Sequence, residues 1–202
     1  MKLYYTPGAC SLAVHIILNE LHLDYDLEKV DIKTHQTETG QDFFKINPKG
    51  AVPTLELSKD VFLTEIVAIL PFLAELDPNK QMIPNMGLER ARVLEWLGYL
   101  STRLHKSYSI FFAGEITDEE RKVGIQQVDT CLTLIDHALE QSEYRYLSSD
   151  HFGPADAYLF VLTSWSAYIK HDLTPYKNIR AFSEKISQRQ SVKIAMKKEG
   201  LL

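Results

Sequence analysis

The sequence is poor in the features that mark secreted, membrane and nucleic-acid-binding proteins. Its 202 residues hold only two cysteines, Cys10 and Cys131, which are far apart in sequence and typical of a reducing compartment. The longest apolar run, residues 66–74, is much shorter than the roughly 20 residues that a membrane helix needs. The first residues lack the basic start and long apolar stretch of a signal peptide. With a net charge of −5, the chain also lacks the basic excess of a nucleic-acid-binding surface. We therefore expect a soluble cytoplasmic protein without nucleic-acid or membrane partners.

What is present is an ordinary globular composition. Hydrophobic residues make up 45% of the chain and charged residues 24%. A chain of this length can bury about 70% of the surface that its unfolded form exposes, which is enough for one or two domains.

The first eighty residues alternate between strand and helix patterns. Residues 3–5 form a short apolar run ended by a Thr-Pro-Gly turn, helical spacing follows over 11–21, and 27–30 is typical of a second strand. These patterns predict a β-α-β unit with parallel strands and a right-handed crossover.

A β-hairpin and a helix are predicted next. Residues 33–50 are polar and loop-like, and residues 54–57 and 61–63 are expected to pair across a Ser-Lys-Asp turn. A helix is expected to begin at Thr64-Glu65, to run to about Leu76, and to be bent by Pro71.

The second half has only helical patterns. A linker is expected over residues 77–80, which divides the chain into domains at 1–78 and 87–202. Apolar residues at helical spacing trace three stripes, which are Val93, Trp96, Leu97, Leu100 and Leu104; Val128, Leu132, Ile135 and Leu139; and Ala155, Leu159, Leu162 and Ile169.

Cys10 lies after the first strand, at the start of a helix. The unpaired N–H groups and partial positive charge of a helix N-terminus favour a thiolate there. The alternative is a small buried residue without a chemical role. Because no second cysteine stands at Cys-x-x-Cys spacing, a dithiol oxidoreductase is not expected, whereas a mixed disulfide with a small thiol stays open.

Two further positions could bind a peptide-like ligand. A cis Val52-Pro53 bond would turn the backbone of Val52 outward, where it could pair with an extended peptide; the alternative is an edge-strand proline. The free N–H groups of the helix that begins at Thr64-Glu65 suit a carboxylate, and Glu65 suits an ammonium. The alternative there is plain capping by Thr64.

These segments, taken together, resemble a known family. The motifs are Lys2-Leu3-Tyr4-Tyr5, Pro7-Gly8-Ala9-Cys10-Ser11-Leu12, Asn47-Pro48-Lys49-Gly50-Ala51-Val52-Pro53, Leu63-Thr64-Glu65, Glu95-Trp96-Leu97, Leu104-His105-Lys106, Ala155-Asp156-Ala157-Tyr158-Leu159-Phe160 and Glu199-Gly200-Leu201. In this order and spacing they resemble the bacterial beta-class glutathione transferases, over nearly the whole chain.

The resemblance implies a fold and an activity. The fold is an α/β thioredoxin-like N-terminal domain (βαβ-ββα) followed by an all-α domain, assembled as a homodimer. The activity is conjugation of the glutathione thiolate to small apolar electrophiles, with thiol-disulfide chemistry through a Cys10–glutathione mixed disulfide as an additional reaction. Glutathione is a co-substrate, and neither a cofactor nor a metal is expected. The alternative is a non-catalytic glutathione-binding or regulatory protein on the same fold.

The resemblance also implies a set of site residues. Cys10 and His105 lie beside the glutathione sulfur and are the expected catalytic residues. Val52 pairs with the cysteinyl part, and Glu65 with the backbone of Ile66 holds the γ-glutamyl end. The remaining expected glutathione-binding residues are His35, Gly98, Thr102, Arg103 and Leu104. The alternative for His105 is a surface or packing histidine.

Three of these residues depart from the family pattern. His35 replaces a lysine, Ile66 a small serine or glycine, and Gly98 an asparagine contributed by the neighbouring subunit. Each loss is expected to weaken glutathione binding by roughly 1 kcal/mol or more.

Other residues are expected to support the site. Gly98, Thr102, His105 and Ser109 form a small or polar stripe that is expected to face the cleft between the domains. The second-substrate pocket is expected to be built from residues 107–113 and the C-terminal helices, with the aromatic residues Tyr108, Phe111 and Phe112 facing an apolar ligand. Asp156 is expected to cap a buried helix, and the residues expected to serve the fold alone are Tyr158, Trp165 and Cys131.

Overall fold

The computed structural model describes residues 1–79 and 81–202, and its N-terminal half is built on one mixed sheet. The strands are β1 (Lys2–Tyr5), β2 (Asp26–Asp31), β3 (Gln36–Thr37), β4 (Thr54–Ser58) and β5 (Val61–Thr64), in the order β3-β2-β1-β4-β5. β1 is parallel to β2 and antiparallel to β4, and β4 forms a hairpin with β5. This arrangement confirms the predicted βαβ-ββα order.

Helices make up most of the remaining structure. They are α1 (Ser11–Glu20), α2 (Ile66–Ala74), α3 (Gly87–Tyr99), α4 (Lys106–Ser109), α5 (Asp118–Gln141), α6 (Pro154–Tyr168), α7 (Lys177–Ser187) and α8 (Gln190–Lys198). Short 3-10 turns at Phe43–Lys45 and Ile110–Phe112 and a π-helical segment at Leu100–His105 complete the elements. The two-part fold class predicted from the sequence is therefore confirmed.

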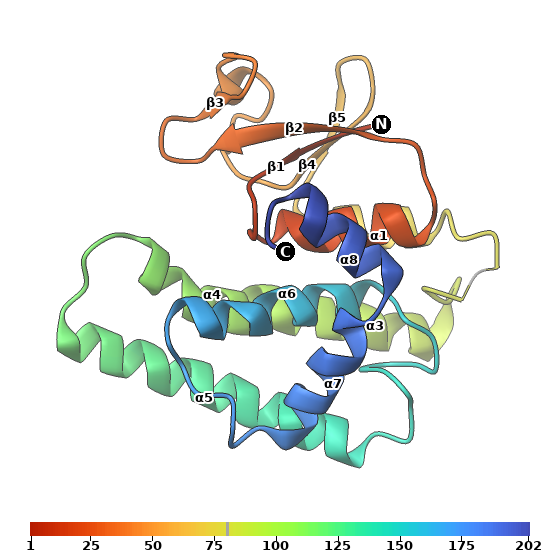
Figure 1. The fold of residues 1–202 in the computed structure, drawn as a ribbon. Coiled ribbons are helices and arrows are strands. Elements are labelled where there is room, and N and C mark those ends of the chain that lie inside the picture. Colours follow the sequence, from red (N-terminus) through yellow and green to blue (C-terminus); the bar gives the residue numbers. More distant parts are fainter. Residues whose placement is uncertain (80) are drawn as a thin grey trace.

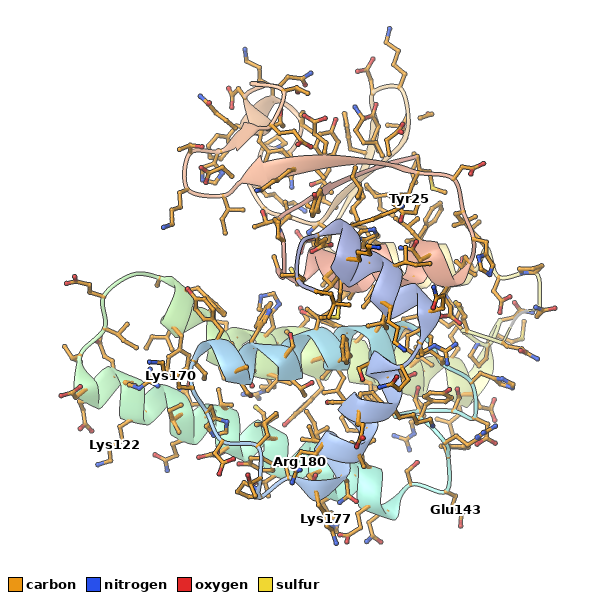
Figure 2. All side chains as sticks on the ribbon, viewed as in Figure 1. Tyr25, Lys122, Glu143, Lys170, Lys177 and Arg180 are labelled. Carbon is orange, nitrogen blue, oxygen red and sulfur yellow. The ribbon has the colours of Figure 1, made fainter. Side chains whose placement is uncertain are left out.

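The two halves pack closely against each other. Figure 1 shows the sheet on one side of α1, with α8 lying alongside α1 and the C-terminus returning to the N-terminal end of α1. α6 contacts α1 from the helical half and also packs against α3 and α7. Charged side chains such as Lys122 and Lys177 extend outward from α5 and α7 (Figure 2).

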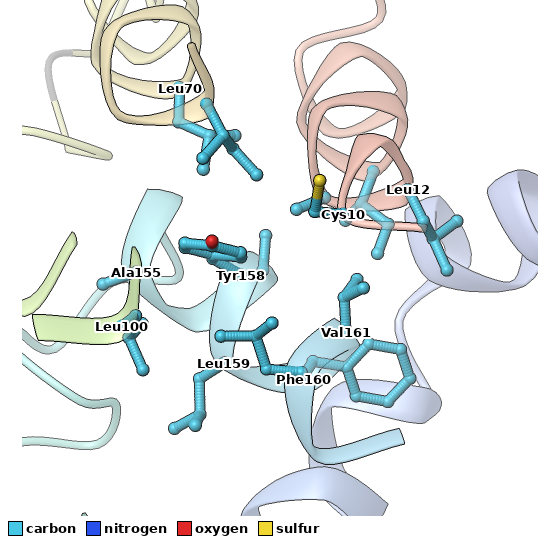
Figure 3. Close-up of a cluster of buried hydrophobic side chains, with 14 of the residues drawn as sticks. Cys10, Leu12, Leu70, Leu100, Ala155, Tyr158, Leu159, Phe160 and Val161 are labelled. Atoms are coloured by element: carbon cyan, nitrogen blue, oxygen red, sulfur yellow. The ribbon is translucent and has the colours of Figure 1, made fainter. Parts of the chain in front are cut away.

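One continuous core joins the halves. It extends from Leu3 of β1 through α1 and α6 to Ala195 of α8. Figure 3 shows part of this cluster, where Leu12 and Leu70 of the first half lie on the side of α6 that carries Tyr158 and Val161. α6 is buried on nearly all faces, as expected for a helix that is apolar all round. The three apolar stripes predicted from helical spacing are buried or partly buried in this core.

Two local predictions are wrong. Residues 33–50 are not entirely a loop, because β3 adds a two-residue strand to the sheet edge. The helix predicted from Thr64 begins instead at Ile66 and ends at Ala74, since Thr64 completes the pairing of β5 with β4. A two-residue strand gives no periodic signal, and an apolar strand running directly into an apolar helix hides the boundary.

The N-terminus of α6 is capped as predicted. The carboxylate of Asp156 accepts hydrogen bonds from the backbone N–H groups of Leu147 and Gly153, each at 2.9 Å. Gly153 is favoured here by packing, because a Cβ at this position would lie 2.6 Å from the carbonyl oxygen of Met82. The absence of a serine or threonine at this cap therefore has a steric reason.

Over the described residues, the structure contains no helix with the length and apolar character needed to span a bilayer.

Candidate functional site

The turn before Cys10 is held by the helical half of the chain. The backbone N–H of Gly8 donates to Glu199 Oε2 at 2.9 Å, and the carbonyl oxygen of Gly8 accepts from Trp165 Nε1 at 2.8 Å. The other carboxylate oxygen of Glu199 lies 2.8 Å from His15 Nδ1 inside α1. Gly8 takes the left-handed conformation that this turn requires. Both halves of the chain therefore fix the position of Cys10.

Cys10 lies at the start of α1, but it is buried. Its side chain is 8% exposed, and Sγ donates to the carbonyl oxygen of Val52 at 3.3 Å. Burial raises the pKa of the Cys10 thiol to about 12, and the N–H groups of Cys10 and Ser11 lower it by less. The prediction of a thiolate at position 10 is therefore wrong for this structure, because desolvation outweighs the helix N-terminus.

Alkylation of Cys10 is expected to be slow at neutral pH. With a pKa near 12, the thiolate fraction at pH 8 is about 10⁻⁴, and it rises about tenfold with each pH unit. We expect the rate of iodoacetamide labelling at Cys10, measured by mass spectrometry in a Cys131→Ala background, to follow this slope up to pH 10. Complete labelling within minutes at pH 7 would contradict the raised pKa.

The peptide bond between Val52 and Pro53 is cis, which decides between the two alternatives left open by the sequence. The N–H of Val52 donates to no acceptor within the described part of the chain. Its carbonyl oxygen accepts the Cys10 thiol. The backbone of Val52 therefore offers one open donor, and its acceptor lies beside the sulfur of Cys10.

Glu65 precedes α2 in a strained backbone conformation. Its φ of 70° is uncommon for any residue other than glycine, and strain of this kind concentrates at functional sites. The carbonyl oxygen of Glu65 accepts from the N–H groups of Ala68 and Ile69, whereas the Ile66 N–H has no acceptor among the described residues. The start of α2 therefore presents an open donor next to a carboxylate.

The alternative left open for Thr64, capping of α2, is wrong. Its hydroxyl accepts from Lys49 Nζ at 3.0 Å instead of an N–H group of α2. Lys49 Nζ also donates to Glu65 Oε1 at 2.8 Å, in an ion pair whose two side chains are more than half exposed. The Glu65 carboxylate therefore already binds an ammonium group in this structure.

His35 lies against the loop that leads to Val52. Its ring stacks on Phe44 with the ring centroids 4.3 Å apart. Its Nδ1 is buried without a hydrogen-bond partner among the residues that the structure describes, and a Cβ on Gly50 would lie 3.0 Å from that atom. The ring is thus held in place by packing, not by hydrogen bonds.

His105 comes from the helical half, at the end of the π-helical segment. Its Nδ1 is 2.6 Å from the hydroxyl of Tyr158, and its ring centroid is 4.9 Å from that of Trp165. Burial lowers the pKa of His105, so the imidazole is neutral at pH 7. His105 is therefore more than the packing histidine of the alternative left open, because a short hydrogen bond to Tyr158 also orders its ring.

Tyr158 is hydrogen-bonded to His105 and belongs to the same buried cluster as Cys10. A charge on Cys10 acts on Tyr158 closely enough to raise the pKa of its hydroxyl. Figure 3 shows the two side chains in the same cluster, where α1 and α6 meet. The prediction that Tyr158 belongs to the core is confirmed by its burial, but its bond to His105 gives it a place in the site as well. Its position inside an apolar run concealed this contact.

The residues predicted around His105 have mixed surroundings. Leu104 is fully buried in the core, so its side chain serves packing, and its part in glutathione binding stays a prediction. Thr102 and Arg103 are exposed, and the Thr102 hydroxyl donates to the carbonyl oxygen of half-buried Gly98 at 2.8 Å. The stripe predicted from Gly98 to Ser109 assumes α-helical spacing, and the π-helical segment at Leu100–His105 breaks that spacing.

The aromatic surface near His105 differs from the predicted one. Tyr108 is fully buried, with its hydroxyl 2.6 Å from Ser166 Oγ, so it does not face a ligand. Phe112 is 46% exposed and packs against Trp165 and Tyr168, of which Tyr168 is 72% exposed. Trp165 and Tyr168 were missed because they lie more than fifty residues from Phe112 in the sequence.

Comparisons with known proteins agree with this geometry. Residues 8–76 match the family model described as the glutathione S-transferase N-terminal domain. The chain is 38% identical to glutathione S-transferase GstA of Escherichia coli O157:H7, over the full length of both. It is similar to the beta-class glutathione S-transferase of Sphingomonas chungbukensis, with 39% identity, a TM-score of 0.95 and complete coverage of both chains. A sphingomonad glutathione S-transferase solved in complex with glutathione has 38% identity and a TM-score of 0.94, again over all of both chains.

Proposed function

The chain belongs to the bacterial beta class of the glutathione S-transferase family, and from this premise we propose that it joins the thiolate of glutathione to small apolar electrophiles. The observation that carries the proposal is the convergence of Cys10, the open N–H of Val52 and His105 at the junction of the two halves. Cys10 and Val52 come from the N-terminal half of the chain, and His105 comes from the helical half.

Each open group matches one part of glutathione. The N–H of Val52 suits the backbone of the cysteinyl residue, paired as a neighbouring strand would be. Glu65 suits the ammonium of the γ-glutamyl group, and the N–H of Ile66 suits its carboxylate. His35 packs beside Gly50, two residues before Val52, and the resemblance to the family assigns it the glycyl end of the tripeptide.

The reaction needs the glutathione sulfur to be ionised. In this proposal, the N–H groups of Cys10 and Ser11 at the start of α1 and a ring N–H of His105 stabilise the thiolate. With a chloronitrobenzene, the thiolate attacks the ring carbon, a C–S bond forms, the C–Cl bond breaks and chloride leaves. The thiol proton goes to solvent before the attack.

Conjugation of 1-chloro-2,4-dinitrobenzene tests this proposal. We expect folded protein with saturating glutathione to form the coloured thioether, and calorimetry to detect binding of glutathione. The absence of both turnover and binding in protein with an intact thermal transition would refute the proposal. Binding without turnover of any electrophile would favour the non-catalytic alternative.

Glu65 is expected to determine much of the glutathione affinity. A hydrogen bond to a charged group contributes about 1.5–3 kcal/mol, so Glu65→Gln is expected to raise the Kd for glutathione about 20-fold. Deaminated glutathione, which lacks the ammonium, should bind the variant and the wild type equally well. Asp60→Asn, in the exposed turn between β4 and β5, is the matched control. A Kd for glutathione unchanged by Glu65→Gln would remove Glu65 from the site.

Conjugation is favoured over thiol-disulfide chemistry by the state of Cys10. A thiol whose pKa is raised to about 12 is a poor nucleophile toward disulfides at neutral pH. In this proposal the main role of Cys10 is therefore to place its backbone N–H beside the glutathione sulfur. The mixed disulfide with glutathione stays a secondary reaction.

We also propose that the protein works as a homodimer. The resemblance to the family supports this, and so does a groove of about 760 Å³ between α3 and the end of α5. Exposed apolar side chains at the groove include Leu88 and Leu134. Light scattering is expected to give twice the chain mass, and a Leu88→Lys/Leu134→Lys variant is expected to shift toward the monomer. A monomeric wild type at micromolar concentration would contradict the proposal.

The division into domains at 1–78 and 87–202 stays a proposal, and the exclusively helical structure described beyond residue 87 supports it. A cytoplasmic location is likewise proposed, in keeping with the unpaired Cys10 and Cys131.

A further inference from the structure

A buried hydrogen bond joins His105 to the core. The hydroxyl of Tyr158 lies 2.6 Å from Nδ1 of His105. His105 belongs to the π-helical segment, and Tyr158 belongs to α6. The bond therefore links two packed elements and holds the ring that is proposed to face the glutathione sulfur.

The direction of this hydrogen bond follows from the burial of Tyr158. Tyr158 is fully buried, and burial raises the pKa of its hydroxyl far above the usual range, so the hydroxyl keeps its proton. Nδ1 of His105 is the hydrogen-bond partner that the described residues give this hydroxyl. If Nδ1 donated instead, the buried phenol proton would be left without an acceptor, so the phenol donates and Nδ1 accepts.

Resting on the function proposed above, we propose that Tyr158 is a positioning residue that fixes His105 as the Nε2–H tautomer. In a neutral imidazole, an Nδ1 that accepts a hydrogen bond leaves the ring proton on Nε2. His105 then presents a hydrogen-bond donor, not a base, to the glutathione sulfur.

The surroundings of His105 are consistent with this role. Nε2 has no hydrogen-bond partner among the described residues, and it is not one of their buried unpaired polar atoms, so it stays accessible. The edge-to-face contact with Trp165 restrains the ring plane. A donor at Nε2 stabilises a thiolate, whereas the other tautomer would place a lone pair opposite the negative sulfur.

Nitrogen NMR of histidine-labelled protein tests the tautomer directly at pH 8. We expect the wild type to show His105 as a single tautomer with the proton on Nε2. Tyr158→Phe is expected to show both tautomers. Tyr108→Phe is the matched control, because Tyr108 is also fully buried and hydrogen-bonded but its partner is Ser166. A wild-type spectrum with the proton on Nδ1, or an unchanged tautomer in Tyr158→Phe, would overturn the proposal.

Kinetics supply the second readout. Loss of one oriented hydrogen bond is expected to lower kcat about tenfold in Tyr158→Phe, with the KM for glutathione within about twofold of the wild type. Tyr108→Phe should lose less than about twofold in kcat. If the two tyrosine variants have equal kcat while His105→Ala is impaired, the positioning role of Tyr158 is refuted, but the proposed function is not. An unimpaired His105→Ala would instead refute the role of His105 in the proposed function.

Discussion

The His105→Ala variant is expected to lose about 100-fold in kcat for conjugation, with little change in the KM for glutathione. Removing one oriented donor from a site that stabilises developing or resident negative charge typically costs 10²–10³-fold, or about 2.7–4 kcal/mol. His105 suits this role because burial lowers its pKa and Tyr158 orients its ring. The neutral ring contributes through an N–H group, so its effect should fall on the thiolate and not on binding of the tripeptide.

Stopped-flow measurement of thiolate absorbance separates this role from a structural one. Bound glutathione in His105→Ala is expected to have a higher thiol pKa than in the wild type. His137→Ala is the matched control, because His137 is an exposed histidine of α5. If His105→Ala leaves both kcat and the pKa of bound glutathione unchanged, His105 is not part of the catalytic group.

The Asp156→Ala variant is expected to lose about 3 kcal/mol of unfolding free energy and about 10 °C in Tm. The change leaves the buried backbone N–H groups of Leu147 and Gly153 without an acceptor, and each unsatisfied group costs about 1–3 kcal/mol. Calorimetric unfolding measures the loss. Glu120→Ala, which removes the exposed capping box of α5, is the matched control and should cost less than about 1 kcal/mol.

The effect of Asp156 also depends on pH. Burial raises the folded-state pKa of this carboxyl to about 7, above its value of about 3.9 in the unfolded chain. The folded state therefore binds the extra proton between about pH 4 and 7, and the stability that Asp156 contributes declines as the pH rises through this range. We expect the difference in stability between the wild type and Asp156→Ala to be larger at pH 5 than at pH 8. A difference that stays constant from pH 5 to pH 8 would mean that the buried carboxylate is ionised throughout this range.

Local patterns in the sequence were sufficient for the fold and for part of the site. Period-two and helical spacing predicted the strands and helices, because one face of each element is buried against a common core. The place of Val52 before Pro53, and of Glu65 near the start of a helix, followed from motif order. Asp156 was predicted as a cap from the resemblance to the family and from its place in the first turn of an apolar helix.

What could not be predicted depends on groups that are distant in sequence. The state of Cys10 is one case: the sequence indicated a helix N-terminus, but the burial that raises its pKa is produced by packing against the rest of the fold. The boundary at Glu65 is another, because β5 pairs through Thr64 and only the paired sheet shows where the strand stops. The exposed aromatic pair of Phe112 and Tyr168 also required the helices to be in place.

The sequence by itself therefore determined the order of elements, the family and the candidate groups that bind a tripeptide thiol. These properties follow from local spacing and from motifs that keep their order along the chain. The tertiary structure alone decided the protonation of Cys10, the bond between His105 and Tyr158 and the burial of Leu104. Desolvation and hydrogen-bond direction depend on which atoms surround a group, and here those atoms come from segments up to 191 residues apart, as in the bond from Gly8 to Glu199.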